Sequence, residues 1–306
     1  MDSSTPRSKL SIWMQAIRPF SFTASLVPVS VGAIIGLCDP VTIRWELFPL
    51  VVICSLLLHA GTNLLNDYSD FEKGVDKEDT YGSSRVLVEG LLESHQVLKG
   101  SIALLALGFL LALILVAIRG IPMLVLSLIG LLGGYLYSGK PFAYKYKALG
   151  DVMVFILMGP LMVIGSYFAL TGDFFARVFY VSLPIGFLVT AILHGNNLRD
   201  ITYDKRAHVK TLAGILGYAK AKMLYRALIS VAYLVVVLLV IMRVVSSWSL
   251  TVFLTLPLAL KNIKSVNNSK PNEPQSLALI DIETAQLHFL FGLLLILSFF
   301  VSCGIA

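Results

Sequence analysis

The sequence NDYSDFEKGVD, residues 66–76, ends a long apolar run at a point where a membrane helix would meet water. The run itself, residues 46–66, is long enough to cross a bilayer as a helix. Asn63, Asp67 and Asp70 follow one another at spacings of four and three, so one helix face carries all three. Carboxylates are unfavourable in or beside a bilayer, and their presence here predicts a functional site at the end of a membrane helix.

A second acidic stretch, NNLRDITYDK at residues 196–205, ends another apolar run and places Asn196, Asp200 and Asp204 on one helix face. Two facing carboxylate clusters repel each other unless a cation lies between them, and Mg²⁺ with phosphate is the usual partnership. We therefore predict two or more Mg²⁺ ions that bridge a diphosphate. The predicted catalytic carboxylates are Asp67, Asp70, Asp200 and Asp204. The predicted metal ligands are Asn66, Asp67, Asp70, Asp76, Asn196, Asp200 and Asp204.

The composition is that of a membrane protein. Of the 306 residues, 57% are hydrophobic and only 14% are charged, and the mean hydropathy is +0.83. A soluble domain carries about a quarter charged residues, so the net charge of +6 does not indicate nucleic-acid binding. Cys38, Cys54 and Cys303 lack the spacing of metal ligands or of a redox pair, and we expect them to act as small apolar residues.

Apolar stretches of about 20 residues, the length needed to cross a bilayer, occur nine times. We therefore predict an all-α, polytopic bundle of nine transmembrane helices. The stretches lie near residues 20–38, 46–66, 101–118, 121–138, 152–171, 178–197, 223–243, 248–264 and 285–304.

The positive charges predict the orientation of this bundle. With the N-terminus inside, the outer loops hold only four of the 24 Lys and Arg residues, namely Arg44, Arg119, Arg177 and Arg243. This asymmetry follows the positive-inside rule. The N-terminus and both acidic stretches are thus predicted to face the cytoplasm of a multi-pass cell-membrane protein.

The chain is predicted to form one transmembrane domain across residues 1–306. Two four-helix halves, about 13–147 and 148–265, precede a ninth helix at 285–304. The halves are inferred from topology, because each acidic stretch ends the second span of its half.

Basic residues on the inner loops are candidates for binding diphosphate oxygens through charge-assisted hydrogen bonds. These candidates are Arg85, Lys145, Arg199 and Lys210. If the substrate is a prenyl diphosphate, loss of its diphosphate leaves a carbocation at an allylic carbon. Aromatic faces or amide oxygens of the protein would shelter this cation. The candidates for this cation and acceptor pocket are Asn63, Tyr137, Tyr144 and Asn197. The simpler interpretation is that the basic residues set topology and the tyrosines lie at the membrane interface.

The chain resembles the UbiA superfamily of intramembrane prenyltransferases over residues 13–300, and within it the menaquinone-pathway 1,4-dihydroxy-2-naphthoate branch. The branch motif Asn-Asp-x-x-Asp-Phe-x-x-Gly-x-Asp matches residues 66–76 throughout. The motif Asn-Asn-x-Arg-Asp-x-x-x-Asp matches residues 196–204. The sequence departs from the broader superfamily at one position. The superfamily has an acidic residue four positions after the second Asp of the first motif, whereas this chain has Gly74 there and its third acid at Asp76. This difference favours the menaquinone-pathway branch.

The resemblance implies a nine-helix bundle around a central cavity that is capped by cytoplasmic loops. It also implies Mg²⁺-dependent transfer of a polyprenyl chain from a prenyl diphosphate to an aromatic quinone precursor, 1,4-dihydroxy-2-naphthoate, within the lipid bilayer. Neither a nucleic acid nor an obligate protein partner is expected.

Two other functions stay open at this point. The acceptor is alternatively 4-hydroxybenzoate, homogentisate or a glycerol-phosphate lipid. A secondary transporter for an anionic metabolite is a different class, since repeats and buried polar residues suit one. The position of the acids at the cytoplasmic helix ends argues against a transporter.

Overall fold

The computed structural model describes residues 7–271 and 273–303, and within these ranges the chain is helical with no strand. The predicted boundaries at residues 1, 304 and 306 lie outside the described residues. The α-helices are α1 (Lys9–Ile17), α2 (Thr23–Ile35), α3 (Phe48–Glu72), α4 (Ser94–Arg119), α5 (Ile121–Ser138), α6 (Gly150–Ile156), α7 (Met162–Thr171), α8 (Ala176–Arg199), α9 (Ile201–Arg206), α10 (Leu212–Leu216), α11 (Tyr218–Ile241), α12 (Leu256–Asn268) and α13 (Ile280–Cys303). Shorter helical segments are η1 (Pro19–Phe22), η2 (Gly36–Cys38), η3 (Trp45–Leu47), η4 (Tyr144–Tyr146), η5 (Leu157–Leu161), η6 (Ser247–Thr255) and η7 (Pro274–Leu277).

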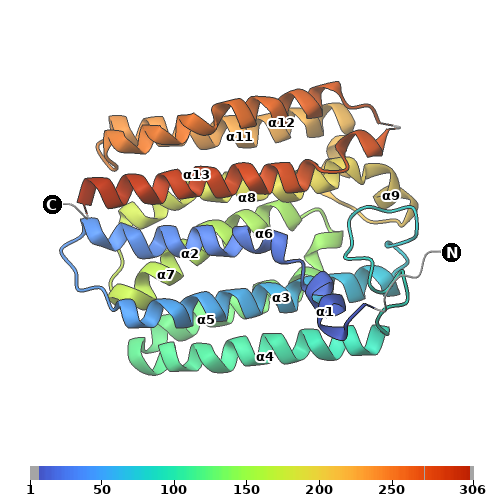
Figure 1. Cartoon of the computed structure of the whole chain (residues 1–306), viewed down its shortest axis with the longest axis horizontal. Coiled ribbons are helices and arrows are strands. Elements are labelled where there is room, and N and C mark those ends of the chain that lie inside the picture. The colour runs from blue at the N-terminus through green and yellow to red at the C-terminus, as the bar shows by residue number, and fades with distance from the viewer. Residues whose placement is uncertain (1–6, 272, 304–306) are drawn as a thin grey trace.

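The long helices run side by side, and the connections that follow α3 and α8 lie together at one end of the bundle, opposite the C-terminus (Figure 1). Neighbours along the sequence pair closely, as α3 does with α4. Distant helices also pack together: α2 contacts α7 and α13, and α8 contacts α11 and α13. This arrangement brings the ends of α3 and α8, and with them both acidic stretches, to the same end of the molecule.

Eight of the described helical segments are long and apolar enough to cross a membrane. The predicted span at 248–264 is not among them. It forms η6 followed by α12, and Lys261, Asn262 and Lys264 make its second half polar. The all-α, multi-pass fold is therefore confirmed, while the count of nine spans and the division into two halves stay predictions.

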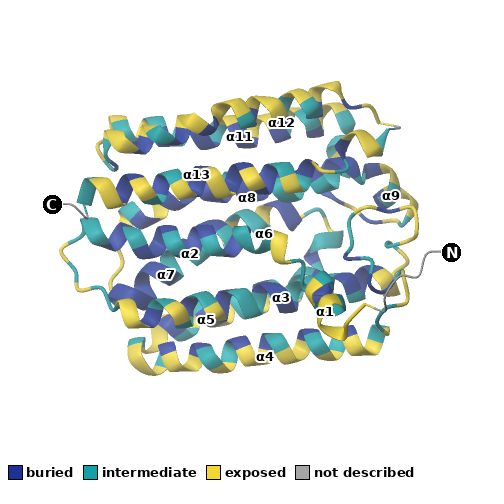
Figure 2. Cartoon of the chain, viewed as in Figure 1, coloured by how far each residue is buried: buried dark blue, intermediate teal, exposed yellow. Residues whose placement is uncertain are grey.

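The outer surfaces of the peripheral helices are apolar. Exposed residues alternate with buried ones along α4 and α11 (Figure 2), and the exposed ones include Ile102, Leu110, Leu234 and Ile241. A water-exposed surface of this kind would be unstable over such an area, so it is the surface that faces lipid.

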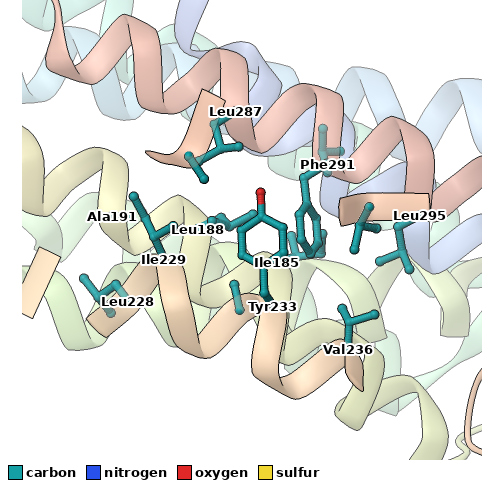
Figure 3. Packing of buried hydrophobic residues seen from close by; sticks show 14 of the residues in the cluster. Ile185, Leu188, Ala191, Leu228, Ile229, Tyr233, Val236, Leu287, Phe291 and Leu295 are labelled. Atoms are coloured by element: carbon teal, nitrogen blue, oxygen red, sulfur yellow. The ribbon is translucent and has the colours of Figure 1, made fainter. Parts of the chain in front are cut away.

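The largest buried cluster joins α8, α11 and α13. The ring of Tyr233 packs edge-on against Phe291 with centroids 5.3 Å apart, amid Ile185, Leu188 and Leu287 (Figure 3). The hydroxyl of Tyr233 lies 2.6 Å from that of Thr255, which satisfies its polar end inside the cluster.

A disulfide joins Cys38, at the end of η2, to Cys303, at the end of α13. The expectation that these two cysteines act as small apolar residues is therefore wrong, because a sequence separation of 265 conceals the pairing. Cys54 alone is a free, buried cysteine among the described residues. The disulfide lies at the bundle end opposite the acidic stretches, where the C-terminus is drawn (Figure 1).

Gly32 permits the close approach of α2 and α7. A Cβ at this position would overlap the carbonyl oxygen of Val163 and come within 2.9 Å of the Ser166 Cβ. The neighbouring Gly165 on α7 has no atom within 4 Å of the same built position.

We predict that Gly32→Ala lowers the melting temperature, because the backbone of α7 must move away at a cost of about 1–3 kcal/mol, typical of overpacking. Gly165→Ala is the matched control and is expected to melt at or above the wild-type temperature. Thermal unfolding of the purified protein in detergent micelles measures both. Equal melting temperatures for the two variants would contradict the proposed helix contact.

Candidate active site

A cavity of about 610 Å³ begins where α3 and α8 end. We call its polar end the mouth; it is lined by Asn66, Asp70, Asp76, Asn196, Asp200 and Asp204. From there the cavity continues between α2, α3, α4, α5 and α7. We call this part the apolar arm; it ends at Val29, Val51, Leu115 and Met123.

The first acidic stretch is held by a lysine. From η4, Lys145 Nζ donates to Asn66 Oδ1 at 2.7 Å and to Asp70 Oδ2 at 2.5 Å. The Tyr146 hydroxyl donates to the other oxygen, Asp70 Oδ1, at 2.8 Å. Burial opposes the charge on Lys145, but the Asp70 carboxylate outweighs it, so the pKa of Lys145 is raised. Lys145 therefore lies against the first acidic stretch, and its predicted binding of diphosphate stays a prediction.

Asp67 is not part of the mouth. Its carboxylate accepts hydrogen bonds from Arg18 and from the hydroxyl of Ser84, together with the Ser84 amide at 3.2 Å. It is 2% exposed and does not line the cavity. Helix geometry places Asp67 only about 60° from Asp70, so the shared face predicted from the spacing does not decide its environment. The contacts with Arg18 and Ser84 hold the Asp67 carboxylate outside the cavity. The structure therefore separates Asp67 from the other predicted ligands.

Asp76 lies in the mouth after the chain turns at Gly74, whose φ of +67° suits glycine. Burial and the nearby carboxylate of Asp70 raise the pKa of Asp76 to about 6. The structure thus brings Asp76 together with Asp70, as the sequence predicts.

The second acidic stretch spans the end of α8 and the start of α9. Asn196 lies on α8, Asp200 is the capping residue between the two helices, and Asp204 lies on α9. All three line the mouth. Burial and the charge of Asp200 raise the pKa of Asp204 to about 7. The hydroxyl of Thr211 donates to Asp204 Oδ2 at 3.2 Å.

Arg199 neutralises Asp200 rather than facing the cavity. Its Nε and Nη2 atoms donate to the two carboxylate oxygens of Asp200, both at 2.8 Å, and Nη1 lies 3.5 Å from Asp281. Arg199 is buried and does not line the cavity. The donors of Arg199 already have partners in the structure, and direct binding of diphosphate by this residue stays a prediction.

Two more predicted diphosphate residues lie outside the cavity. Arg85 pairs with Glu89 at 3.0 Å and donates to the carbonyl oxygen of Glu78 at 3.1 Å, which shapes its own loop. Lys210 is exposed, and its carbonyl oxygen accepts from the amide of Ala148 at 2.6 Å. Of the four predicted residues, only Lys145 lines the cavity. A position on an inner loop made Arg85, Arg199 and Lys210 candidates, but it did not indicate where their side chains point.

The four predicted pocket residues all line the cavity: Asn63, Tyr137, Tyr144 and Asn197. The rings of Tyr137 and Tyr144 pack edge-on with centroids 5.5 Å apart. Asn63 donates to the carbonyl oxygen of Ile17 at 3.0 Å, and Asn197 donates to Asp151 Oδ1 at 2.9 Å.

The resemblance implies cytoplasmic loops over the cavity, and the loop between α3 and α4, residues 73–93, covers the mouth. Sequence reasoning missed which residues of this covering loop contact the acidic stretches. Ser84 on this loop binds Asp67 at one side, and Asp79 pairs with Arg206 of α9 at 2.7 and 2.9 Å at the other. Between them, a Cβ on Gly82 would lie 3.0 Å from Asp200 Oδ2. The loop therefore connects the two acidic stretches, and its small residues GSS at 82–84 are the only sequence signal for it.

A buried pair behind the mouth was also missed. His194 lies with Nδ1 2.5 Å from Asp151 Oδ2 and with Nε2 3.0 Å from the carbonyl oxygen of Ala221. Because Asp151 also accepts from Asn197, the pair fixes the orientation of a cavity-lining amide.

The donor atoms of the mouth fit a hard divalent cation, since they are carboxylate and amide oxygens. The Oδ1 atom of Asn196 is buried without a hydrogen-bond partner, so the site has an oxygen that a cation or donor would satisfy. Within residues 7–271 and 273–303, no three His, Cys, Asp or Glu side chains gather closely enough to hold an ion alone. Mg²⁺ suits such a site, because one or two carboxylates and substrate phosphates commonly hold it.

Residues 25–290 match the UbiA prenyltransferase family. The chain is 33% identical to 1,4-dihydroxy-2-naphthoate octaprenyltransferase of Bacillus subtilis (strain 168), over 95% of this chain and 92% of that protein. It is 32% identical to UbiA prenyltransferase domain-containing protein 1 of Homo sapiens, over 94% of this chain and 85% of that protein.

Solved structures share the fold. A UbiA homolog from Aeropyrum pernix K1 superposes with a TM-score of 0.70 at 16% identity, over 92% of this chain and 97% of that one. A UbiA homolog from Archaeoglobus fulgidus, bound to GPP and Mg²⁺, superposes with a TM-score of 0.62 at 19% identity, over 93% and 99%. Sequence and fold together show that this chain belongs to the UbiA prenyltransferase family and is a membrane prenyltransferase.

Proposed function

We propose that the chain transfers a polyprenyl group from a prenyl diphosphate to 1,4-dihydroxy-2-naphthoate, with Mg²⁺ at the mouth. The observation that carries this proposal is the joining of a polar mouth, rich in carboxylate and amide oxygens, to a long apolar arm. Asp70 and Val51 are 19 residues apart on α3, so the cavity extends about 28 Å along that helix. Such a shape suits a ligand with an anionic head and a long apolar tail.

The residues around the mouth have separate roles in this reaction. Lys145 donates to diphosphate oxygens, and the rings of Tyr137 and Tyr144 present their faces to the allylic cation. The C–O bond breaks with its electron pair on the diphosphate, and a ring carbon of the acceptor attacks the cation. That ring carbon then loses its substituent, either a proton or the carboxylate as CO₂, and the electron pair of the broken bond restores the aromatic ring. Bound Mg²⁺ would neutralise charge on the leaving diphosphate.

Three predicted residues receive positioning roles in this proposal. Asp67 holds Arg18 and Ser84, and therefore the start of the covering loop. Arg199 orients the carboxylate of Asp200 through two hydrogen bonds. Arg85 shapes the covering loop itself.

The relatives support the choice of acceptor. The Bacillus subtilis relative is named for 1,4-dihydroxy-2-naphthoate and matches this chain over nearly its whole length. The alternatives are 4-hydroxybenzoate, homogentisate and a glycerol-phosphate lipid, and a structure titled for digeranylgeranylglyceryl phosphate synthase shares the fold at 22% identity. A transporter is disfavoured because the apolar arm ends at a buried cluster that contains Val29, Val51, Leu115 and Met123.

We also propose that the mouth faces the cytoplasm. The disulfide between Cys38 and Cys303 lies at the opposite end of the bundle, and disulfides persist in oxidising compartments outside the cytosol. The uneven distribution of Lys and Arg supports the same orientation.

The proposal predicts which product forms. Purified full-length protein is incubated with Mg²⁺, a polyprenyl diphosphate and one acceptor at a time, and mass spectrometry identifies the product. We expect prenylated 1,4-dihydroxy-2-naphthoate, and we expect EDTA to abolish it. Prenylation of only a different acceptor would overturn the acceptor assignment, and no product with any acceptor would overturn the reaction.

A second prediction separates metal ligands from positioning residues. Asp70→Asn and Asp200→Asn are expected to lower turnover by about 100-fold or more, because their oxygens line the mouth. They should also weaken binding of Mn²⁺, measured by titration calorimetry with pyrophosphate present. Asp67→Asn should lower turnover while Mn²⁺ affinity stays near the wild-type value, since Arg18 and Ser84 bind that carboxylate. A loss of Mn²⁺ affinity in Asp67→Asn equal to that in Asp70→Asn would contradict this division.

A third prediction tests the orientation. Asp79 and Asp173 are both exposed, and they lie in the covering loop and in the connection between α7 and α8. Membrane-impermeant maleimide on intact cells is expected to label Asp173→Cys but not Asp79→Cys, and Asp79→Cys should react after permeabilisation. The reverse pattern would place the mouth outside the cell.

A further inference from the structure

The ammonium of Lys145 occupies the part of the first acidic stretch that lines the cavity. It lies between Asn66 Oδ1 and Asp70 Oδ2, at 2.7 and 2.5 Å, and its side chain is only 15% exposed. With Tyr146 on Asp70 Oδ1, both oxygens of this carboxylate are bound by donors from the chain itself. The first acidic stretch therefore already contains a cation.

In the second acidic stretch the cation is the guanidinium of Arg199, which binds both oxygens of Asp200 and does not line the cavity. The other oxygens of this stretch have no cationic partner among the contacts of the described residues. Asn196 Oδ1 is buried without a partner, and Asp204 accepts only a neutral hydroxyl hydrogen bond, from Thr211, among the contacts of the described residues. Only one side of the mouth is thus closed by an ammonium that reaches into the cavity.

We propose that Lys145 is an internal counter-ion that excludes a divalent cation from Asn66 and Asp70 until a diphosphate binds. This inference rests on the proposed function. A lysine ammonium in contact with these two oxygens hinders the binding of a metal ion there, because the two cations need the same acceptor atoms and repel each other. A diphosphate supplies the ammonium with other anionic oxygens and so releases Asn66 and Asp70.

The surroundings of Lys145 allow this exchange. Its Nζ lies 6.0 Å from the ring centroid of Tyr137 and 5.5 Å from that of Tyr146, so aromatic rings border the ammonium on its way into the cavity. The flexible lysine side chain makes a short displacement possible without movement of η4.

Metal and diphosphate then bind with positive coupling. Binding of either ligand weakens the contact between Lys145 and Asp70, which hinders binding of the other ligand. By thermodynamic linkage, diphosphate raises the affinity for the metal by the same factor as the metal raises the affinity for diphosphate. The free protein holds the metal weakly at this position.

The test measures Mn²⁺ affinity of the purified full-length protein in detergent by titration calorimetry without diphosphate. We expect Lys145→Met to bind Mn²⁺ at least about tenfold more tightly than wild type, because a competing cation in direct contact has been removed. Lys147→Met is the matched control. It removes the same charge two residues away, where the side chain is exposed, and its affinity should stay within about threefold of wild type.

Pyrophosphate provides the second arm. It should tighten Mn²⁺ binding to the wild type and should tighten it much less in Lys145→Met, where no ammonium remains to be displaced. Lys145→Gln, which keeps hydrogen-bond donors without the charge, replaces Lys145→Met if the latter does not fold. Equal Mn²⁺ affinities for Lys145→Met, or Lys145→Gln in its place, and Lys147→Met would overturn the proposal.

The Asp70→Asn variant separates failure of this proposal from failure of the proposed function. If Asp70→Asn weakens Mn²⁺ binding but loss of the Lys145 charge does not tighten it, the metal site stands and the counter-ion does not. If Asp70→Asn leaves Mn²⁺ binding unchanged even with pyrophosphate present, no metal uses this position, and both the counter-ion and the proposed metal site at Asp70 fall.

Discussion

Carboxylates that are shielded from water at the ends of membrane helices need positive charge close by, and the rest of the site follows from this constraint. Desolvation of a charged group is expensive, so an unpaired carboxylate in such a place either finds a cation or becomes protonated. Three carboxylates have basic partners, in the pairs Lys145–Asp70, Arg18–Asp67 and Arg199–Asp200. Two others, Asp76 and Asp204, show pKa values raised by burial and by neighbouring acids. The free protein therefore has a surplus of acidic groups at the mouth, which is an environment that attracts divalent cations.

The same ion pairs also position the chain around the mouth. Arg18 begins η1 just before the first membrane helix, and its bond to Asp67 ties that helix to the end of α3. Ser84 binds the same carboxylate and so brings the covering loop into place. At the other side of the mouth, Arg206 binds Asp79 of this loop. Residues that appear independent in the sequence are therefore coupled through the covering loop. Substitution of one of them is expected to shift the side chains of the others.

The sequence predicted the helices, the ends that carry the acids and most of the residues that line the mouth. Helical periodicity gave this information, because Asn66 and Asp70, or Asn196 and Asp200, are four residues apart and must share a side of their helix. It failed where a side chain chooses between the cavity and a partner from elsewhere in the chain. Arg18 binds Asp67 from 49 residues away, and the pairing of Cys38 with Cys303 spans nearly the whole sequence. Such contacts depend on tertiary packing, which local spacing does not encode.

A distinction between mobile and fixed cations follows from these geometries. The guanidinium of Arg199 donates twice to one carboxylate from a buried position, and such a planar, bidentate pair holds its geometry. The ammonium of Lys145 is a single point charge on a flexible side chain, and it borders the cavity. The arginine therefore keeps the carboxylate of Asp200 in one orientation during the reaction, whereas the lysine is free to change partners when an anionic ligand arrives. One basic residue that can move, among several that cannot, lets the site accept a highly charged diphosphate without loss of the framework that orients its carboxylates.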